Sequence, residues 1–165
     1  MQESLSEVTR AELPLVVFNM ARGQSDYYQA TRGGGHGDYR HLVLAPIDVN
    51  EAIHHVQLAF HLADHWRNPV LIYGDYLLGH TAEAVDVVRE SFEPLPKKDW
   101  AVDGSRGGGG NPRNLNPIGM VPGIKGIDPD SFWKRLQAKH DAMEAAEKRF
   151  EQEHVEDVGL VLVAN

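Results

Sequence analysis

The sequence has 165 residues, with 16 Lys and Arg against 24 Asp and Glu, and a formal net charge of −8. A chain of this size is expected to form one domain or part of a larger one, and its negative charge disfavours nucleic acid and anionic membranes as partners. It contains no cysteine, which excludes disulfides, thiolate nucleophiles and cysteine-held iron–sulfur clusters in this chain.

Targeting signals are also missing from the sequence. No apolar run approaches the roughly 20 residues that cross a bilayer, and the first residues do not resemble a signal peptide. We therefore expect a cytoplasmic protein.

The chain opens on an amphipathic helix, and four short apolar runs are predicted as strands: 13–18, 42–45, 70–73 and 160–163. Their apolar residues are continuous rather than alternating, which is typical of parallel strands covered on both faces. Asp26 to Gln29 resemble a short helix. Together these runs predict an α/β fold in which helices flank a parallel sheet.

Residues 49–66 are predicted as a helix that completes a β-α-β unit, and Pro69 ends the pattern. Its packed face is expected to contain Val49, Ala52, Ile53, Val56, Ala59, Phe60 and Ala63. A solvated helical face is predicted from Glu83, Asp86, Arg89, Glu90 and Glu93.

The segment 94–129 holds six of the nine prolines and the run Gly107 to Gly110, so it is predicted to be a long loop. Such a loop is functional, lies on a partner, or is a disordered insert. Asp128, a predicted N-cap followed by Pro129, begins a helix to about residue 153. Its packed stripe is expected to contain Phe132, Leu136, Met143 and Phe150.

The densest motif is the run Gly33, Gly34, Gly35, His36, Gly37 and Asp38. Its glycines allow close approach of the backbone to a ligand or a neighbouring chain, but its spacing is not that of a phosphate-binding loop. It is either an active-site or interface loop, or a connection into the strand at 42–45.

His54, His61 and His65 share one face of the helix at 49–66. A zinc site needs a third ligand at the right height, and His54 lies roughly 10 Å along the axis from His61. A solvated or subunit-facing surface is the better interpretation, and we assign no metal site.

Arg22 follows the first strand at its carboxyl end, where open α/β sheets bind ligands. A guanidinium there either binds a carboxylate in bidentate fashion or lies in a surface turn. Asp75 has the same position after the strand at 70–73, and it too is either a ligand-binding residue or part of a surface turn. No catalytic triad or carboxylate pair stands out, so no catalytic residue is assigned.

Several blocks of the sequence, in order, resemble the alpha subunit of 2-oxoacid:ferredoxin oxidoreductases, with the branched-chain 2-oxoisovalerate type as the closest match. The resemblance runs from Glu3 to Val163 and rests mainly on residues 25–40, 43–46, 59–64 and 67–70. It implies a partial thiamine-diphosphate-binding domain of the pyrimidine type. Residues 1–93 would be the C-terminal half of this domain, 94–127 the loop, and 128–165 a long helix and the first strand of a following domain.

The resemblance also implies an activity. Such enzymes decarboxylate a 2-oxoacid oxidatively, form an acyl-CoA from coenzyme A and pass electrons to ferredoxin. Thiamine diphosphate with magnesium would bind at the interface with a partner subunit, and iron–sulfur clusters would lie only in partner subunits. Arg22 matches the arginine that reaches the substrate carboxylate, and the Gly33 to Asp38 loop lies near the cofactor cleft or an interface.

Two departures from the family pattern qualify this expectation. A glycine- and proline-rich segment that family members carry between the positions of Gly23 and Gln24 is missing here. The front half of the pyrimidine domain, with the glutamate that activates the cofactor, would precede Met1. The first hypothesis is therefore a truncated or split subunit that is inactive by itself, and the alternative is a non-catalytic interaction domain derived from that subunit.

Overall fold

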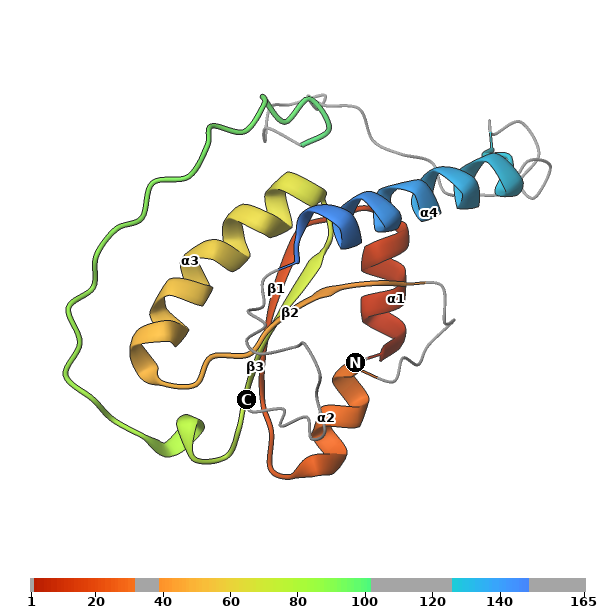
Figure 1. The fold of residues 1–165 in the computed structure, drawn as a ribbon. Helices are drawn as coiled ribbons and strands as arrows, with labels where there is room; N and C mark the ends of the chain where they lie inside the picture. Colours follow the sequence, from red (N-terminus) through yellow and green to blue (C-terminus); the bar gives the residue numbers. More distant parts are fainter. Residues whose placement is uncertain (1, 32–38, 102–125, 149–165) are drawn as a thin grey trace, which may run out of the picture.

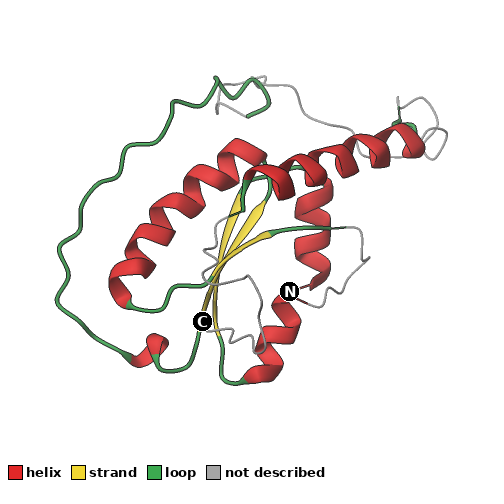
Figure 2. Ribbon diagram, in the orientation of Figure 1, coloured by secondary structure: helices red, strands yellow, loops and turns green. Residues whose placement is uncertain are grey.

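The computed structural model describes residues 2–31, 39–101 and 126–148. The helices and strands of these residues are α1 (Gln2–Arg10), β1 (Leu15–Met20), α2 (Gln24–Thr31), β2 (Leu42–Leu44), α3 (Val49–Trp66), β3 (Pro69–Gly74), the short 3-10 helix η1 (Leu78–His80) and α4 (Pro129–Ala146). The strands form a parallel sheet in the order β1-β3-β2 (Figures 1 and 2). The predicted α/β class with a parallel sheet is confirmed.

Strand β3 is the centre of the core, because it pairs with β1 on one edge and β2 on the other. Leu71 and Tyr73 point to the face that α1 and α2 cover, while Val70 and Ile72 point to the face that α3 covers. Figure 1 shows α1 and α2 on one side of the sheet and α3 on the other. This alternation follows from the two-residue period of a strand. All six residues of β3 are buried, which explains its unbroken apolar sequence.

Helix α3 has the predicted bounds, and both of its ends are capped. Asp48 accepts a hydrogen bond from the Glu51 backbone N–H at 2.8 Å, and Arg67 ends the helix in a left-handed conformation with φ of 50°. Ala59, Leu62 and Ala63 are its buried residues.

The prediction that Phe60 belongs to the packed face of α3 is wrong, because its side chain is 60% exposed. At 100° per residue, Phe60 is turned about a quarter of a circle away from Ala59, which lies against the sheet. The expected strand at 13–18 also shifts to Leu15–Met20. Pro14 precedes the observed strand and has no N–H to donate to a ladder.

The predicted helical face at residues 83–93 is also wrong, because residues 81–98 have no helix or strand. Their polar backbone groups bond to side chains of α3 instead. Gln57 Nε2 donates to the Val88 carbonyl at 2.9 Å, and the Glu90 N–H donates to Gln57 Oε1 at 3.0 Å. β-branched Val85, Val87 and Val88 disfavour a helix here.

Helix α4 begins at the predicted place and crosses the amino-terminal edge of the sheet (Figure 1). Asp128 caps it by accepting from the Ser131 N–H at 3.0 Å. It ends at Ala146, earlier than predicted. Its buried residues are Phe132, Leu136, His140 and Met143, while Phe150 and the predicted strand at 160–163 lie outside the described residues.

Charged side chains attach α4 to the loops that enter β1 and β3. The buried carboxylate of Glu12 pairs with Arg135 at 2.9 Å and with Lys139 at 3.8 Å. Lys139 also donates to Asn68 Oδ1 at 3.1 Å. Because Glu12 and Lys139 have little contact with water, each depends on its partner for charge compensation, whereas the Arg135 side chain is half exposed.

We predict that Glu12→Gln lowers the free energy of unfolding by about 3 kcal/mol, because it leaves the largely buried Lys139 ammonium without a carboxylate. The glutamine keeps the size of the side chain at a position with φ of 51°. Urea denaturation measures the change. Lys134→Met, which breaks an exposed pair with Asp130, is the control and should change stability by less than about 0.5 kcal/mol. Equal effects of both variants would contradict the prediction.

A second prediction concerns His140, whose pKa is lowered to about 4, chiefly by burial and then by the positive charge of Lys139. Between pH 6.5 and 4 the unfolded chain takes up a proton here and the folded chain does not, so stability falls as the pH drops through this window. Denaturation at several pH values should show that the free energy of unfolding declines over this window. In His140→Leu this decline should be smaller by about 2 kcal/mol. Parallel curves for the two proteins would refute the assignment.

Candidate functional site

The carboxyl ends of β1 and β3 lie side by side, because Met20 is the register partner of Gly74. The Ala21 N–H donates to the Gly74 carbonyl at 2.8 Å and continues the pairing by one residue. Arg22 and Asp75, the two residues predicted from the sequence, therefore follow neighbouring strands at the same edge. This edge is where open α/β sheets bind ligands.

Gly74 leaves room for the Met20 side chain at the two strand ends. A Cβ atom at this position would lie 2.7 Å from Met20 Sδ and 3.1 Å from Leu78 Cδ2. A side chain here would shift the ends of the Met20 and Leu78 side chains.

Arg22 is held by Asp26, a residue of the first turn of α2. Asp26 Oδ2 accepts from the Arg22 backbone N–H at 2.8 Å and from its Nε at 3.4 Å. The carboxylate is 9% exposed and the Arg22 side chain 86%. The contact through Nε leaves the outer end of the guanidinium facing solvent. The backbone hydrogen bond from Arg22, followed by the one from its side chain, lowers the pKa of Asp26.

Beside Arg22 is a shallow cavity of about 390 Å³ with mainly apolar walls. Ala21 and Gly23, the two neighbours of Arg22, line it together with Tyr27, Tyr73 and Leu77. The rings of Tyr27 and Tyr73 meet edge to face, with centroids 5.8 Å apart. The cavity is of a size and composition that suits a small organic ligand.

The electrostatics of this cavity keep Tyr73 protonated. Burial raises the pKa of its hydroxyl, and the charges of Asp26 and Asp75 and the neighbouring Tyr27 raise it further. At neutral pH this side chain is therefore a neutral hydrogen-bond donor. Tyr73 is not among the site residues predicted from the sequence; the available signal was a phenol at the carboxyl end of an otherwise aliphatic strand.

Asp75 has a structural role at this edge. Its Oδ1 accepts from the Leu78 N–H at 2.7 Å, and its carbonyl accepts from the Gly79 N–H at 3.1 Å. It therefore shapes the turn into η1. Both predicted residues are exposed, but the Asp75 carboxylate is engaged by the backbone of this turn.

The predicted loop Gly33, Gly34, Gly35, His36, Gly37 and Asp38 lies outside the described residues. Its flanks are anchored in the core: the Tyr39 hydroxyl donates to Gln2 Oε1 at 3.0 Å, and His41 Nε2 bonds to the Ala30 carbonyl at 2.8 Å. Its place near a cofactor or an interface stays a prediction.

The histidines of α3 face the extended segment 81–98. His54 contacts the Glu90 carboxylate, and the His61 ring stacks on Phe92 with centroids 4.7 Å apart. His61 and His65 stack on each other at 6.0 Å. Across the described ranges, no group of three or more His, Asp and Glu side chains has the arrangement of a metal site.

Comparison with known proteins gives this geometry a context. Residues 1–155 match the family described as pyruvate flavodoxin/ferredoxin oxidoreductase, thiamine diphosphate-binding. The VorB subunit of ketoisovalerate oxidoreductase from Methanothermobacter marburgensis is 39% identical over 173 residues, which cover 99% of this chain and 47% of that protein. VorB from Methanothermobacter thermautotrophicus is 36% identical over the same shares of both chains.

Another relative covers a smaller part of the chain. The KorA subunit of 2-oxoglutarate synthase from Methanothermobacter thermautotrophicus is 38% identical over 98 residues, or 53% of this chain and 26% of that protein. The chain spans about half the length of the VorB proteins that it matches. In the parts of the chain that the structure describes, no helix is both long and apolar enough to cross a membrane.

The contact between Arg22 and Asp26 predicts a pH-dependent stability. Because the pKa of Asp26 is lowered on folding from its ordinary value of 3.8, the contribution of its charged form is present above that value and is lost as the pH falls below it. Asp26→Asn should therefore be less stable than the wild type at pH 7, and the difference should close below pH 3.8. Urea denaturation of both proteins at pH 7 and below pH 3.8 measures this difference in stability. A difference that does not depend on pH would contradict it.

Proposed function

Because this chain belongs to the pyruvate flavodoxin/ferredoxin oxidoreductase, thiamine diphosphate-binding family, we propose that it acts as a subunit of a branched-chain 2-oxoacid oxidoreductase. The similarity to VorB supports the branched-chain type, since it covers nearly the whole chain. The structural observation that carries the proposal is the exposed guanidinium of Arg22, held by Asp26 beside an apolar cavity at the carboxyl edge of the sheet.

Arg22 is the proposed site for the substrate carboxylate. Asp26 holds the guanidinium through Nε, so the terminal N–H groups remain available for the two parallel hydrogen bonds that a carboxylate accepts. The apolar wall formed by Leu77 and the aromatic rings suits the hydrocarbon side chain of a branched 2-oxoacid.

The same cavity suits part of the proposed cofactor. Tyr27, Tyr73 and Leu77 give flat and aliphatic surfaces that fit a heteroaromatic ring, and the neutral Tyr73 hydroxyl is a donor for a ring nitrogen. Thiamine diphosphate, when bound, supplies a nucleophilic carbon and an electron sink for decarboxylation. We assign to the partner subunit the binding of the diphosphate through magnesium, so the complete site would lie between chains.

No residue of this chain is assigned as catalytic. Among the described residues, Asp26 and Asp75 are the carboxylates that follow β1 and β3 at this edge, and each already accepts a backbone hydrogen bond, from Arg22 and Leu78 respectively. We propose that these two groups orient the local backbone and the substrate-binding arginine. The acid–base work on the cofactor is then assigned to a carboxylate elsewhere in the complex.

The proposed complex converts a 2-oxoacid and coenzyme A to an acyl-CoA and carbon dioxide. The electrons released pass through iron–sulfur clusters of partner subunits to ferredoxin, in agreement with a chain that contains no cysteine. We propose a cytoplasmic complex with neither nucleic acid nor membrane as a partner. Within it, residues 1–93 form the pyrimidine-binding part, 94–127 a loop and 128–165 the start of a following domain.

We predict that Arg22→Ala in the assembled complex raises the KM for the 2-oxoacid and lowers kcat. Loss of a charged hydrogen-bond partner costs about 1.5–3 kcal/mol, or roughly a ten- to hundredfold drop in kcat/KM. Steady-state kinetics with 3-methyl-2-oxobutanoate, coenzyme A and ferredoxin measures both constants. Arg89→Ala, at an exposed position in the segment 81–98, is the control and should match the wild type.

Two outcomes would contradict this function. Unchanged kinetics in Arg22→Ala would refute the role of the arginine. If the wild-type chain binds its partner subunits and the complex still shows no turnover, the alternative of a non-catalytic interaction domain would replace the enzyme.

A further inference from the structure

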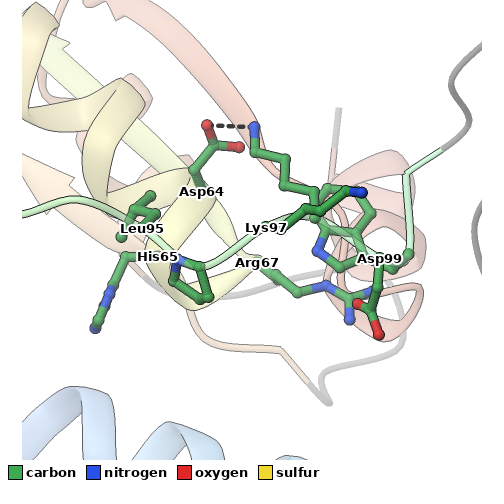
Figure 3. A pocket seen from close by; sticks show the side chains of 9 residues that line it. Asp64, His65, Arg67, Leu95, Lys97 and Asp99 are labelled. Carbon is green, nitrogen blue, oxygen red and sulfur yellow. Dashed lines mark hydrogen bonds and ion pairs between the residues drawn. The ribbon is translucent and has the colours of Figure 1, made fainter.

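A second cavity, of about 370 Å³, lies at the opposite end of the sheet (Figure 3). The last turn of α3 forms one wall and residues 95–100 form the other. Arg67 is the residue that directly precedes Asn68 and β3, so this cavity belongs to the amino-terminal edge. It is therefore distinct from the cavity beside Arg22.

Arg67 is fixed in this cavity by several contacts. Its backbone has φ of 50° at the end of α3, and its N–H donates to the Ala63 carbonyl. Its Nε donates to the Glu12 carbonyl at 3.1 Å, and its guanidinium carbon lies 4.5 Å from the centroid of the Trp100 ring. The side chain is therefore ordered before any ligand binds, which reduces the entropy lost on binding.

The positive charge of Arg67 is incompletely compensated. In the described ranges it forms no ion pair, although Asp99 lies nearby (Figure 3). Burial lowers its pKa, the positive charge of Arg135 lowers it further, and Asp99 opposes both effects. A partly buried cation beside a second cation gains from a bound anion.

The two lysines of the cavity differ in their contacts. Lys98 pairs with Asp64 at 2.6 Å, which uses one of the two carboxylates that line the cavity. Lys97 is exposed and has no ion-pair partner within the described part of the chain. Arg67 and Lys97 are therefore the cations available to a ligand, and the second carboxylate of the lining, Asp99, offsets part of the Arg67 charge.

The negative end of the α3 dipole opposes an anion here, and two of the carbonyls at this end are already bonded. The Ala63 carbonyl accepts from the N–H groups of Arg67 and Asn68, the second at 3.2 Å. The Arg67 carbonyl accepts from Lys139 Nζ at 3.2 Å. These bonds and the side-chain cations leave the cavity suited to an anion.

We propose that this cavity binds a small phosphate-bearing molecule through Arg67 and Lys97, with Trp100 as an aromatic wall. A guanidinium matches two phosphate oxygens at once, and the ammonium of Lys97 matches a third. A phosphate group carries a charge of about −1.5 to −2 at pH 7. Two cations therefore bind a phosphate ligand better than a carboxylate ligand, which carries a single charge. This site is independent of the proposed oxidoreductase activity.

Titration of the full chain with inorganic phosphate at constant ionic strength tests the site, with the melting temperature as readout. Bound phosphate should raise Tm along a saturable curve, because a ligand of the folded state stabilises it. Acetate at the same ionic strength should raise it less. A phosphate effect equal to that of acetate, or one that does not saturate, would overturn the proposal.

Variants locate the binding. Lys97→Met should weaken the apparent phosphate affinity about tenfold, and Arg67→Lys should weaken it as well, because it keeps the charge and loses the two-pronged geometry. Lys134→Met, at an exposed position on α4, and Arg22→Ala should leave the affinity unchanged. Equal affinities of Lys97→Met and Lys134→Met would refute the site, and loss of binding in Arg22→Ala would place the phosphate at the other edge of the sheet.

Discussion

The structure depends on the pairing of β3, which has a parallel neighbour on each edge and a helix layer on each face. Parallel pairing brings the carboxyl ends of β1 and β3 together, so Arg22 and Asp75 lie at the same edge of the sheet. It equally brings together the residues that enter these strands, Glu12 and Arg67. Two separate clusters of polar groups therefore arise at opposite ends of the sheet from one set of backbone hydrogen bonds.

The arginines at the two edges have different electrostatic surroundings. Arg22 has a carboxylate partner in Asp26, and its outer end faces water. Arg67 is partly buried, lies on the Trp100 ring and has Arg135 as a neighbouring cation. At Arg22 the guanidinium is positioned by a carboxylate and stays in contact with water. At Arg67 positive charge is left for a ligand to balance.

Helix α4 connects the chain's most distant described residues to the core through polar contacts. Lys139 bonds to the buried Asn68, whose Nδ2 donates to the Arg40 carbonyl at 2.8 Å. Trp66 Nε1 donates to Glu147 at 2.7 Å near the other end of the helix. The position of α4 is thus specified by hydrogen-bond geometry as well as by its apolar stripe. Loss of a single partner would leave the remaining buried polar groups without a hydrogen bond.

Residue periodicity and capping signals determined the α/β class, the bounds of α3, the start of α4 at Asp128 and the place of Arg22 at a strand end. These features depend on backbone geometry and on neighbours within a few residues, which a sequence records directly. Only the tertiary structure decided that Asp26 holds Arg22, that Phe60 is exposed, that residues 81–98 are extended along α3, and that Arg67 meets Trp100 in a cavity. The reason is that side-chain contacts between distant segments, such as Lys139 with Asn68 across 71 positions, follow from how the layers pack and leave no local pattern.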